Sequence, residues 1–546
     1  MAVDIVGLVV VIVFYVAILI FGILAARWFE KKNLSDVSDE EKMMVAGRKI
    51  GSVVGTFTII ATLCGGGFLN GTAEGIMHDG LAWTIFPFAM ALGYFIAGWL
   101  YAGKMREARY LTMLDPLQEK FSNGMVAIIF LGSLLGDVFW SASILGALGE
   151  DLSVIIDLNV EIAIWVSAAI AVIYTGFGKM VSVALTDIVQ LMFMVIGMFL
   201  CLPFAITNEN VENISSTFDT SWGGEIPKNT IAAWIDLAIA MTLGTIPWQT
   251  YFQRVLAMKS PKHAQWLSLT GGIGSLIFTI PPIIIGAIGA STNWNATELN
   301  RTLTDDDAAI VLPLVVHYLT PRPVAVIALA ALCAAVMSSI DSAVLSCSTL
   351  FTHNVYKLAF RPRATQFELV VVQTVSVIVA GVASSLIAIY VNTIYGLFVL
   401  AGDVVYVIVF PQLTAAVFTS WVNGYGSFFG FVIGLVLRLG AGEPFLNFQP
   451  FIEYPYYTED DGQLFPFRFL AMMCNLLGIY AFSYLFKVLF EKDILPRSWD
   501  VCHVIKTAEL DTGMDKQGDE KMTTENGITN AGYSTDDVVG VKMIKL

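Results

Sequence analysis

Long apolar runs, separated by short polar connections, fill most of the chain. Many of them continue for about 17 to 34 residues without an Asp, Glu, Lys or Arg, and a helix that crosses a bilayer needs about 20 apolar residues. Division of these runs at Gly, Pro and polar clusters predicts about thirteen transmembrane helices. The predicted spans are 5–26, 51–77, 80–102, 124–150, 162–178, 181–206, 232–253, 264–290, 323–351, 368–390, 395–419, 426–440 and 469–489. The pattern therefore predicts an all-α integral membrane protein.

The composition agrees with this pattern and excludes other classes of protein. Of the 546 residues, 56% are hydrophobic and 14% are charged, and the mean hydropathy is +0.72, whereas an ordinary soluble chain carries about 25% charged residues. A soluble enzyme, a nucleic-acid-binding protein and a receptor with a single membrane anchor are therefore excluded. A porin-like barrel is also excluded, because its strands alternate apolar and polar residues over roughly ten positions.

Motifs for catalysis or for a resident cofactor do not stand out in the sequence. The five histidines are scattered, and the six cysteines have neither zinc-site nor disulfide-framework spacing. The chain has no GxSxG or HExxH motif, and its longest Gly run lacks the Lys-Ser/Thr of a phosphate-binding loop. We therefore expect a protein that is not an enzyme and has no cofactor.

The distribution of charge predicts the orientation in the membrane. The net charge is −15, and with an extracellular N-terminus the connections after odd-numbered spans carry 25 of the 30 Lys and Arg residues. The positive-inside rule therefore favours an extracellular N-terminus and a cytoplasmic C-terminus. Three glycosylation sequons, which begin at Asn213, Asn295 and Asn300, fall in connections that this topology places outside. We expect these three asparagines to be glycosylated.

Two predicted spans are interrupted by Gly or Pro near their centres, at Cys64-Gly65-Gly66-Gly67 and at Gly244-Thr245-Ile246-Pro247. Irregular backbone at membrane depth is tolerated where it is buried in protein or lines a cavity. The two breaks are five spans apart, which is typical of inverted repeats whose broken helices form a transporter's central site. Close helix packing is an alternative explanation for the glycines alone.

This organisation divides the chain into five parts, of which the last is polar, acidic and poor in aromatic residues. We expect that part to be a disordered cytoplasmic tail that contacts trafficking machinery. The parts are a first transmembrane helix (1–27), a first repeat with the start of the second (51–253), the second repeat (232–419), peripheral helices (426–489) and the tail (496–546).

Four acidic residues fall well inside predicted spans, away from the span ends, and no Lys or Arg lies at comparable depth in those spans. They are Asp137, Asp187, Asp341 and Asp403. A buried carboxylate in a membrane is costly, so each is a functional candidate, and acids without buried bases indicate bound cations. The alternative, equally weighted for Asp187, is that some only hold helices together. Near Asp341, adjacent Ser hydroxyls and carbonyls freed by an unwound helix are suitable oxygen ligands for sodium.

Five motifs occur in order along the chain, at residues 70–74 (NGTAE), 112–116 (TMLDP), 246–256 (IPWQTYFQRVL), 335–339 (AVMSS) and 410–413 (FPQL). They resemble the sodium/solute symporter family and, within it, the choline transporter branch. The likeness extends from about residue 3 to residue 495. The resemblance implies a leucine-transporter-type fold with a five-plus-five inverted repeat. It also implies import of choline, or of a related quaternary-ammonium or amine solute, together with sodium, and it implies that transport depends on chloride. The implied locations are the plasma membrane, at the presynaptic terminal, and the synaptic vesicle membrane.

The resemblance also implies binding residues. The family's sodium site maps onto backbone oxygens near Ala61, Cys64 and Ala335 and onto the hydroxyls of Ser338 and Ser339, with Asp341 beside them. Choline transporters hold the ammonium group in an aromatic cage, because a trimethylammonium cation has no N–H to donate and is attracted to ring faces. Trp140 and Trp248 match that cage.

The chain departs from the choline transporters at three cage positions, where Leu63 and Met90 replace a typical Trp and a typical Tyr and Phe398 replaces a Trp. Asp137 stands where the family typically has Glu, and it supplies part of the attraction for a cation if it faces the cavity. Loss of two rings weakens cation binding by roughly 1–4 kcal/mol. The departures leave three alternatives, which are weak choline binding, a retuned solute specificity, or a cage rebuilt from Tyr94, Phe68 or Phe398. A sodium symporter of the same fold for another solute and a non-transporting ligand sensor remain alternative functions, and the oligomeric state stays open.

Overall fold

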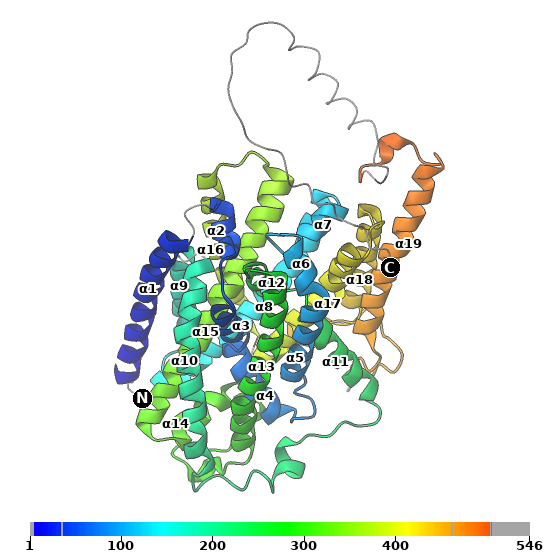
Figure 1. Ribbon diagram of the computed structural model, residues 1–546. Helices are drawn as coiled ribbons and strands as arrows, with labels where there is room; N and C mark the ends of the chain where they lie inside the picture. The colour runs from blue at the N-terminus through cyan, green and yellow to red at the C-terminus, as the bar shows by residue number, and fades with distance from the viewer. Residues whose placement is uncertain are drawn as a thin grey trace, which may run out of the picture.

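The computed structural model describes residues 5–33, 37–177, 180–391, 393–459, 462–502 and 504. Within these residues the secondary structure consists of helices and a few isolated bridges. Ten helices are long and apolar enough to cross a membrane, or eleven if one bent pair counts as a single span. The prediction of an all-helical membrane protein is confirmed (Figure 1).

A helix stands at the place of each of the thirteen predicted spans. In order they are α1 (Ile5–Asn33), α3 (Ser52–Leu63) with α4 (Gly66–His78), α5 (Phe86–Ala97), α8 (Asn123–Ile156), α9 (Val160–Phe177), α10 (Met180–Ile206), α11 (Ile231–Gly244) with α12 (Gln249–Leu256), α13 (Pro261–Ala290), α15 (Arg322–Leu350), α16 (Gln366–Tyr390), α17 (Ile394–Phe418), α18 (Gly424–Gly440) and α19 (Phe467–Glu491). Short helices in the connections, which the hydropathy pattern does not predict, are α2 (Asp39–Val45), α6 (Gly103–Glu107), α7 (Asp115–Lys120) and α14 (Val311–Leu319).

The first predicted break separates α3 from α4, whose axes differ by 47°. Cys64 ends α3, and Gly65 precedes α4 in an extended conformation. A side chain on Gly65 would overlap the hydroxyl of Ser339 on α15. Glycine at this position therefore lets the broken helix approach α15 closely.

The second predicted break separates α11 from α12. Residues 245–248 lie between the two helices, and Trp248 is extended, with φ −109° and ψ 127°. Pro247 has no backbone N–H to donate to a helical hydrogen bond, which accounts for the interruption. A side chain on Gly244, at the end of α11, would overlap the carbonyl of Gly402 on α17. The second break is therefore packed against α17.

Helices at the centre of the bundle differ from those at its edge in burial. Every residue of α15 from Ala328 to Leu350 is buried, whereas α1 and α16 carry large exposed apolar side chains such as Val13 and Val379. In Figure 1, α1 and α19 stand at opposite edges of the bundle. The two half-helices that follow the breaks, α4 and α12, lie with α8, α15 and α17 in the interior, where a site can be shielded from lipid.

The three predicted glycosylation sequons lie in two connections that meet at one end of the bundle. Val211 and Thr292 form an antiparallel bridge between these connections, and Asn213, Asn295 and Asn300 are exposed. Most of the predicted tail, residues 505–546, lies outside the described residues. Its first residues are ordered, because the hydroxyl of Tyr425 in α18 donates a hydrogen bond to the carbonyl of Trp499.

Candidate functional site

A small cavity of about 30 Å³ lies between the second break and helices α3, α5, α8 and α17. Five of the six residues predicted to bind solute line it, and Asp137, buried in α8, does not. No lining residue is charged. The lining residues are Leu63, Phe86, Met90, Tyr94, Trp140, Thr245, Trp248, Thr250, Tyr251, Phe398 and Gly402.

Aromatic rings form most of the cavity wall and contact one another in pairs. The rings of Trp140 and Trp248 meet edge to face, with centroids 5.2 Å apart. The Tyr94 and Tyr251 centroids are 5.1 Å apart, and those of Phe86 and Phe398 are 4.0 Å apart. An uncharged wall of ring faces is suited to a quaternary ammonium group, which accepts cation–π contacts and needs no hydrogen-bond acceptor.

Hydrogen bonds to the broken backbone and to α13 fix two of these rings. The indole N–H of Trp248 donates to the carbonyl of Gly244 at 2.7 Å, so this ring is oriented by the end of α11. The hydroxyls of Tyr251 and Ser268 are 2.6 Å apart. The second break therefore sets the position of the cavity's central ring.

Sequence reasoning missed five of the lining residues, namely Phe86, Thr245, Thr250, Tyr251 and Gly402. Tyr251 carried the clearest signal, because it lies three residues after Trp248 in the same quoted motif. Of the residues considered for a rebuilt cage, Tyr94 and Phe398 line the cavity and Phe68 does not.

The residues predicted to hold sodium meet where α15 approaches the first break. The hydroxyl of Ser338 donates to the carbonyl oxygens of Ala61 at 2.7 Å and of Ala335 at 3.0 Å. The hydroxyl of Ser339 donates to the carbonyl of Thr62 at 2.8 Å. Cys64 ends the same turn of α3, and Asp341 is buried two residues beyond Ser339. The resulting oxygen cluster has the donor type that a hard cation prefers.

Comparison with known proteins identifies the family. A model of the sodium:solute symporter family matches residues 43–434, which is more than half of the chain. The chain belongs to this family. It is 41% identical over 545 residues to high-affinity choline transporter 1 of Drosophila melanogaster, with 98% of this chain and 88% of that protein covered. It is 42% identical over 529 residues to high affinity choline transporter 1 of Homo sapiens, with 94% and 91% covered.

A solved structure supports the fold. A Na⁺-coupled sialic acid symporter in a substrate-bound, outward-open state matches with a TM-score of 0.71 at 17% identity, covering 88% of this chain and 98% of that chain. This likeness confirms the predicted leucine-transporter-type architecture. Membership of a symporter family also confirms that the chain is a transporter and not an enzyme.

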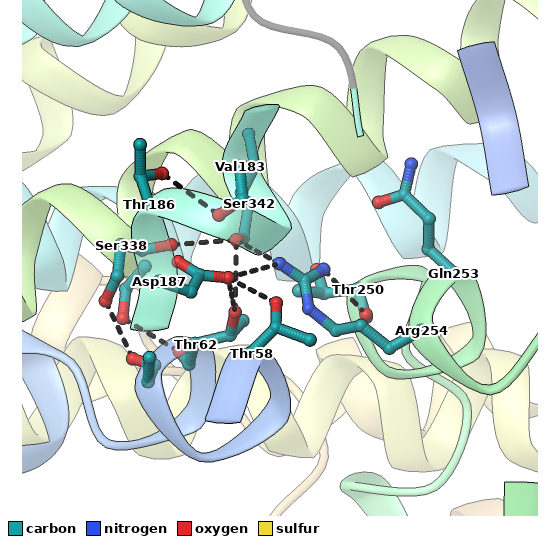
Figure 2. A network of polar contacts seen from close by, with 12 residues as sticks. Thr58, Thr62, Val183, Thr186, Asp187, Thr250, Gln253, Arg254, Ser338 and Ser342 are labelled. Atoms are coloured by element: carbon teal, nitrogen blue, oxygen red, sulfur yellow. Dashed lines mark hydrogen bonds and ion pairs between the residues drawn. The ribbon is translucent and has the colours of Figure 1, made fainter. Parts of the chain in front are cut away.

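The prediction that the buried acids of this symporter lack buried bases is wrong for Asp187. Its carboxylate lies 3.6 Å from the guanidinium of Arg254 and accepts hydrogen bonds from the hydroxyls of Thr58 and Thr62 (Figure 2). Arg254 also donates to the hydroxyl of Ser342 on α15. The sequence analysis placed Arg254 in a cytoplasmic connection. This prediction is wrong because α12 is short and largely polar, so that hydropathy does not show that the helix is buried.

Asp403 is paired as well. Its carboxylate lies 2.7 Å from Arg438 of α18 and 2.9 Å from Arg468 of α19. Arg438 lies near the end of the predicted span 426–440 and Arg468 directly precedes the span 469–489, and the charge distribution assigned both to the extracellular side. Asp187 and Asp403 therefore have protein partners, which favours the alternative that such acids hold helices together.

Proposed function

We propose that this symporter imports choline, or a related small quaternary-ammonium or amine solute, together with sodium. The observation that carries the proposal is the uncharged aromatic cavity at the second break, one wall of which is formed by the end of the first break. The two choline transporters that are 41–42% identical to the chain support the same solute class.

Sodium is proposed to bind the oxygen cluster of Ala61, Ala335, Ser338 and Ser339, with Cys64 and Asp341 beside it. In the structure the Ser339 hydroxyl is bonded to the carbonyl of Thr62, and the next residue, Leu63, lines the cavity. A sodium ion that orders this turn would therefore also fix one wall of the solute site. This shared turn is the proposed coupling between the two cargoes.

The energy for uptake comes from the sodium gradient and the membrane potential. One sodium ion that enters down a tenfold gradient releases about 1.4 kcal/mol, and each elementary charge gains about 2.3 kcal/mol per 100 mV. At 100 mV these sum to about 3.7 kcal/mol, which supports at most roughly 500-fold accumulation of a neutral solute and more of a cation.

Finer assignments remain part of the proposal. The solute site is proposed to comprise Leu63, Met90, Trp140, Trp248 and Phe398, with Asp137 acting from α8 outside the cavity wall. We further propose chloride dependence, glycosylation at Asn213, Asn295 and Asn300, an extracellular N-terminus, and a cytoplasmic tail that contacts trafficking machinery. The proposed locations are the plasma membrane of presynaptic terminals and the membrane of synaptic vesicles.

Uptake of labelled choline tests the proposal directly. Cells that express the chain at their surface are given low micromolar choline, with sodium present and then replaced by an inert cation. We expect saturable uptake that requires sodium. Absence of uptake by protein at the cell surface would contradict choline as the solute.

A second candidate, a symporter of the same fold for another amine or a neutral osmolyte, is favoured by Leu63 and Met90. These two residues place aliphatic side chains in the cavity wall where choline transporters typically carry rings. Competition of the uptake by a panel of amines and osmolytes distinguishes the two candidates. A solute that competes at lower concentration than choline would replace it as the proposed cargo.

A further inference from the structure

A pair of buried polar side chains outside the cavity joins α8, which lines the cavity, to α4, the half-helix that follows the first break. Asp151 lies on α8, the helix that carries Trp140, and Asn70 lies on α4, which follows the first break. Both side chains are fully buried, with 0% of their surface exposed. The amide nitrogen of Asn70 donates to one carboxyl oxygen of Asp151 at 2.7 Å.

That hydrogen bond leaves two buried oxygens without a donor among the described residues. They are Asn70 Oδ1 and Asp151 Oδ2, one on each member of the pair. Buried acceptors without a donor are costly, and an ionised buried carboxylate without a positive partner costs considerably more. Two unsatisfied acceptors on one hydrogen-bonded pair therefore indicate a missing donor.

The surroundings of Asp151 supply no positive charge. Among the described residues no Lys, Arg or His forms an ion pair with it, in contrast to Asp187 and Asp403. The titratable groups that act on it electrostatically are Glu150 on α8, Tyr15 on α1 and Cys333 on α15. One of these is an acid and the other two are neutral groups at ordinary pH.

We infer that Asp151 is a proton-binding site, in which a protonated carboxyl group donates from Oδ2 to Asn70 Oδ1. One proton then satisfies both acceptors, because the two side chains form a pair of reciprocal hydrogen bonds, and it also removes the uncompensated charge. On deprotonation the proton passes to water, and Asn70 Oδ1 and the negatively charged carboxylate of Asp151 are left buried without a donor between them.

The location gives this proton a role in holding the first break. Around the pair, α4 lies close to α8, because a side chain on Gly67 of α4 would come within 2.6 Å of the Ser143 hydroxyl on α8. The protonated pair therefore fixes the half-helix after the break against the helix that carries Trp140. Loss of the proton is expected to loosen this contact, so the stability of the folded chain should fall as pH rises.

Asp151→Asn is the decisive variant, because an asparagine amide supplies the missing donor without a proton. Purified wild-type protein and Asp151→Asn are compared by thermal unfolding from pH 5 to 9. An unfolded Asp releases its proton at about pH 3.9 whereas the folded chain keeps it, so wild-type stability should decrease with pH, by at most tenfold in the unfolding equilibrium per pH unit. Asp151→Asn should melt at or above the wild-type temperature at neutral pH, with a shallower pH dependence.

Asp187→Asn is the matched control, because it also neutralises a fully buried carboxyl but leaves Arg254 without its partner. We expect this variant to melt well below wild type at every pH. Equal destabilisation of the two variants, or an unchanged pH dependence in Asp151→Asn, would overturn the inference.

Two further measurements separate the proton from a metal ion. A wild-type minus Asp151→Asn infrared difference spectrum should contain the carbonyl band of a protonated carboxyl group. If sodium raises the melting temperature of wild type but not of Asp151→Asn, the two oxygens hold a cation instead. Neither readout depends on choline uptake, so failure of the proposed solute leaves this test intact.

Discussion

Both broken helices have an interruption of the backbone near the middle of the span, but the side chains that face the two interruptions differ in chemical type. At the first break, α15 presents the hydroxyls of Ser338 and Ser339 to carbonyl oxygens of α3. At the second break, α8 presents the ring of Trp140 to that of Trp248. A hard inorganic cation is suited to the first environment and an organic cation to the second. If the proposed sites are right, the helix that faces each break, and not the break itself, determines which cation binds there.

The breaks are also linked by a polar network whose residues do not line the cavity. Arg254, in the helix after the second break, reaches Asp187 together with Thr58 and Thr62 of the helix before the first break. The same guanidinium contacts Ser342 of α15, whose hydroxyl donates to the carbonyl of Ser338. This network makes the geometry of one break depend on that of the other.

The largest expected effect comes from breaking this link. Arg254→Gln leaves Asp187 buried without a positive partner, which should destabilise the protein by about 3–5 kcal/mol. Thermal unfolding of the purified protein measures the loss. The double variant Arg254→Gln with Asp187→Asn should recover part of it, because it removes the unpaired charge. If the double variant were less stable than the single variant, the unpaired charge would not be the cause.

Arg301→Gln is the matched control, since the Arg301 side chain is 46% exposed whereas that of Arg254 is 1% exposed. The Arg301 guanidinium lowers the pKa of Asp307 to about 2, so this pair is ionised at every working pH. Because water reaches the pair at Arg301 and screens the charges, we expect a smaller loss than for Arg254→Gln. A comparable loss in both arginine variants would show that burial of the Arg254 pair is not what matters.

The next largest effect is expected at the first break alone. Gly65→Ala places a methyl group where the Ser339 hydroxyl now lies, so α15 and the break must separate. Overpacking of this kind costs about 1–3 kcal/mol, and the sodium concentration for half-maximal uptake should rise. Gly124→Ala on α8, where a side chain meets open space, should leave both quantities close to wild type. Normal sodium activation in Gly65→Ala would exclude this contact from the sodium site.

A smaller effect is expected at the second break. Trp248→Ala removes one ring from the cavity and should raise the KM for choline by about 2–30-fold, as expected for a cation–π contact of about 0.5–2 kcal/mol. Trp248→Phe keeps a ring and should have a smaller effect. Trp266→Ala, on the outward face of α13 with 62% of that residue exposed, should not change the KM. If the two alanine variants behave alike, Trp248 does not contact the solute.

Much of this arrangement could be predicted from the sequence, because the deciding signals are local. Charge-free runs of sufficient length place the spans, and mid-span glycine or proline places both breaks. The cage positions Trp140 and Trp248 and the serine pair were predicted through the family resemblance, and the structure brings each set together.

The parts that could not be predicted depend on contacts between distant segments. Arg254 lies in a short polar helix, so hydropathy assigns it to a connection, and only the fold shows that it faces Asp187. Phe86 and Gly402 line the cavity because α5 and α17 pack beside the second break, which no motif in either segment indicates. The contact between Asn70 and Asp151 could likewise not be predicted, because nothing in the sequence around either residue indicates that the two side chains meet.

The smallest effect is expected from a variant that adds an aromatic ring to the cavity instead of removing one. Met90 lines the cavity from α5, one turn before Tyr94, and a tyrosine there would add a ring face opposite the second break. Met90→Tyr should lower the KM for choline by about 2–5-fold, which corresponds to about 0.5–1 kcal/mol. The sodium concentration for half-maximal uptake should not change, because the added ring does not touch the first break. A gain for choline alone would establish that solute affinity is set by the rings around the second break, whereas a parallel gain for sodium would show that the two breaks cannot be adjusted separately.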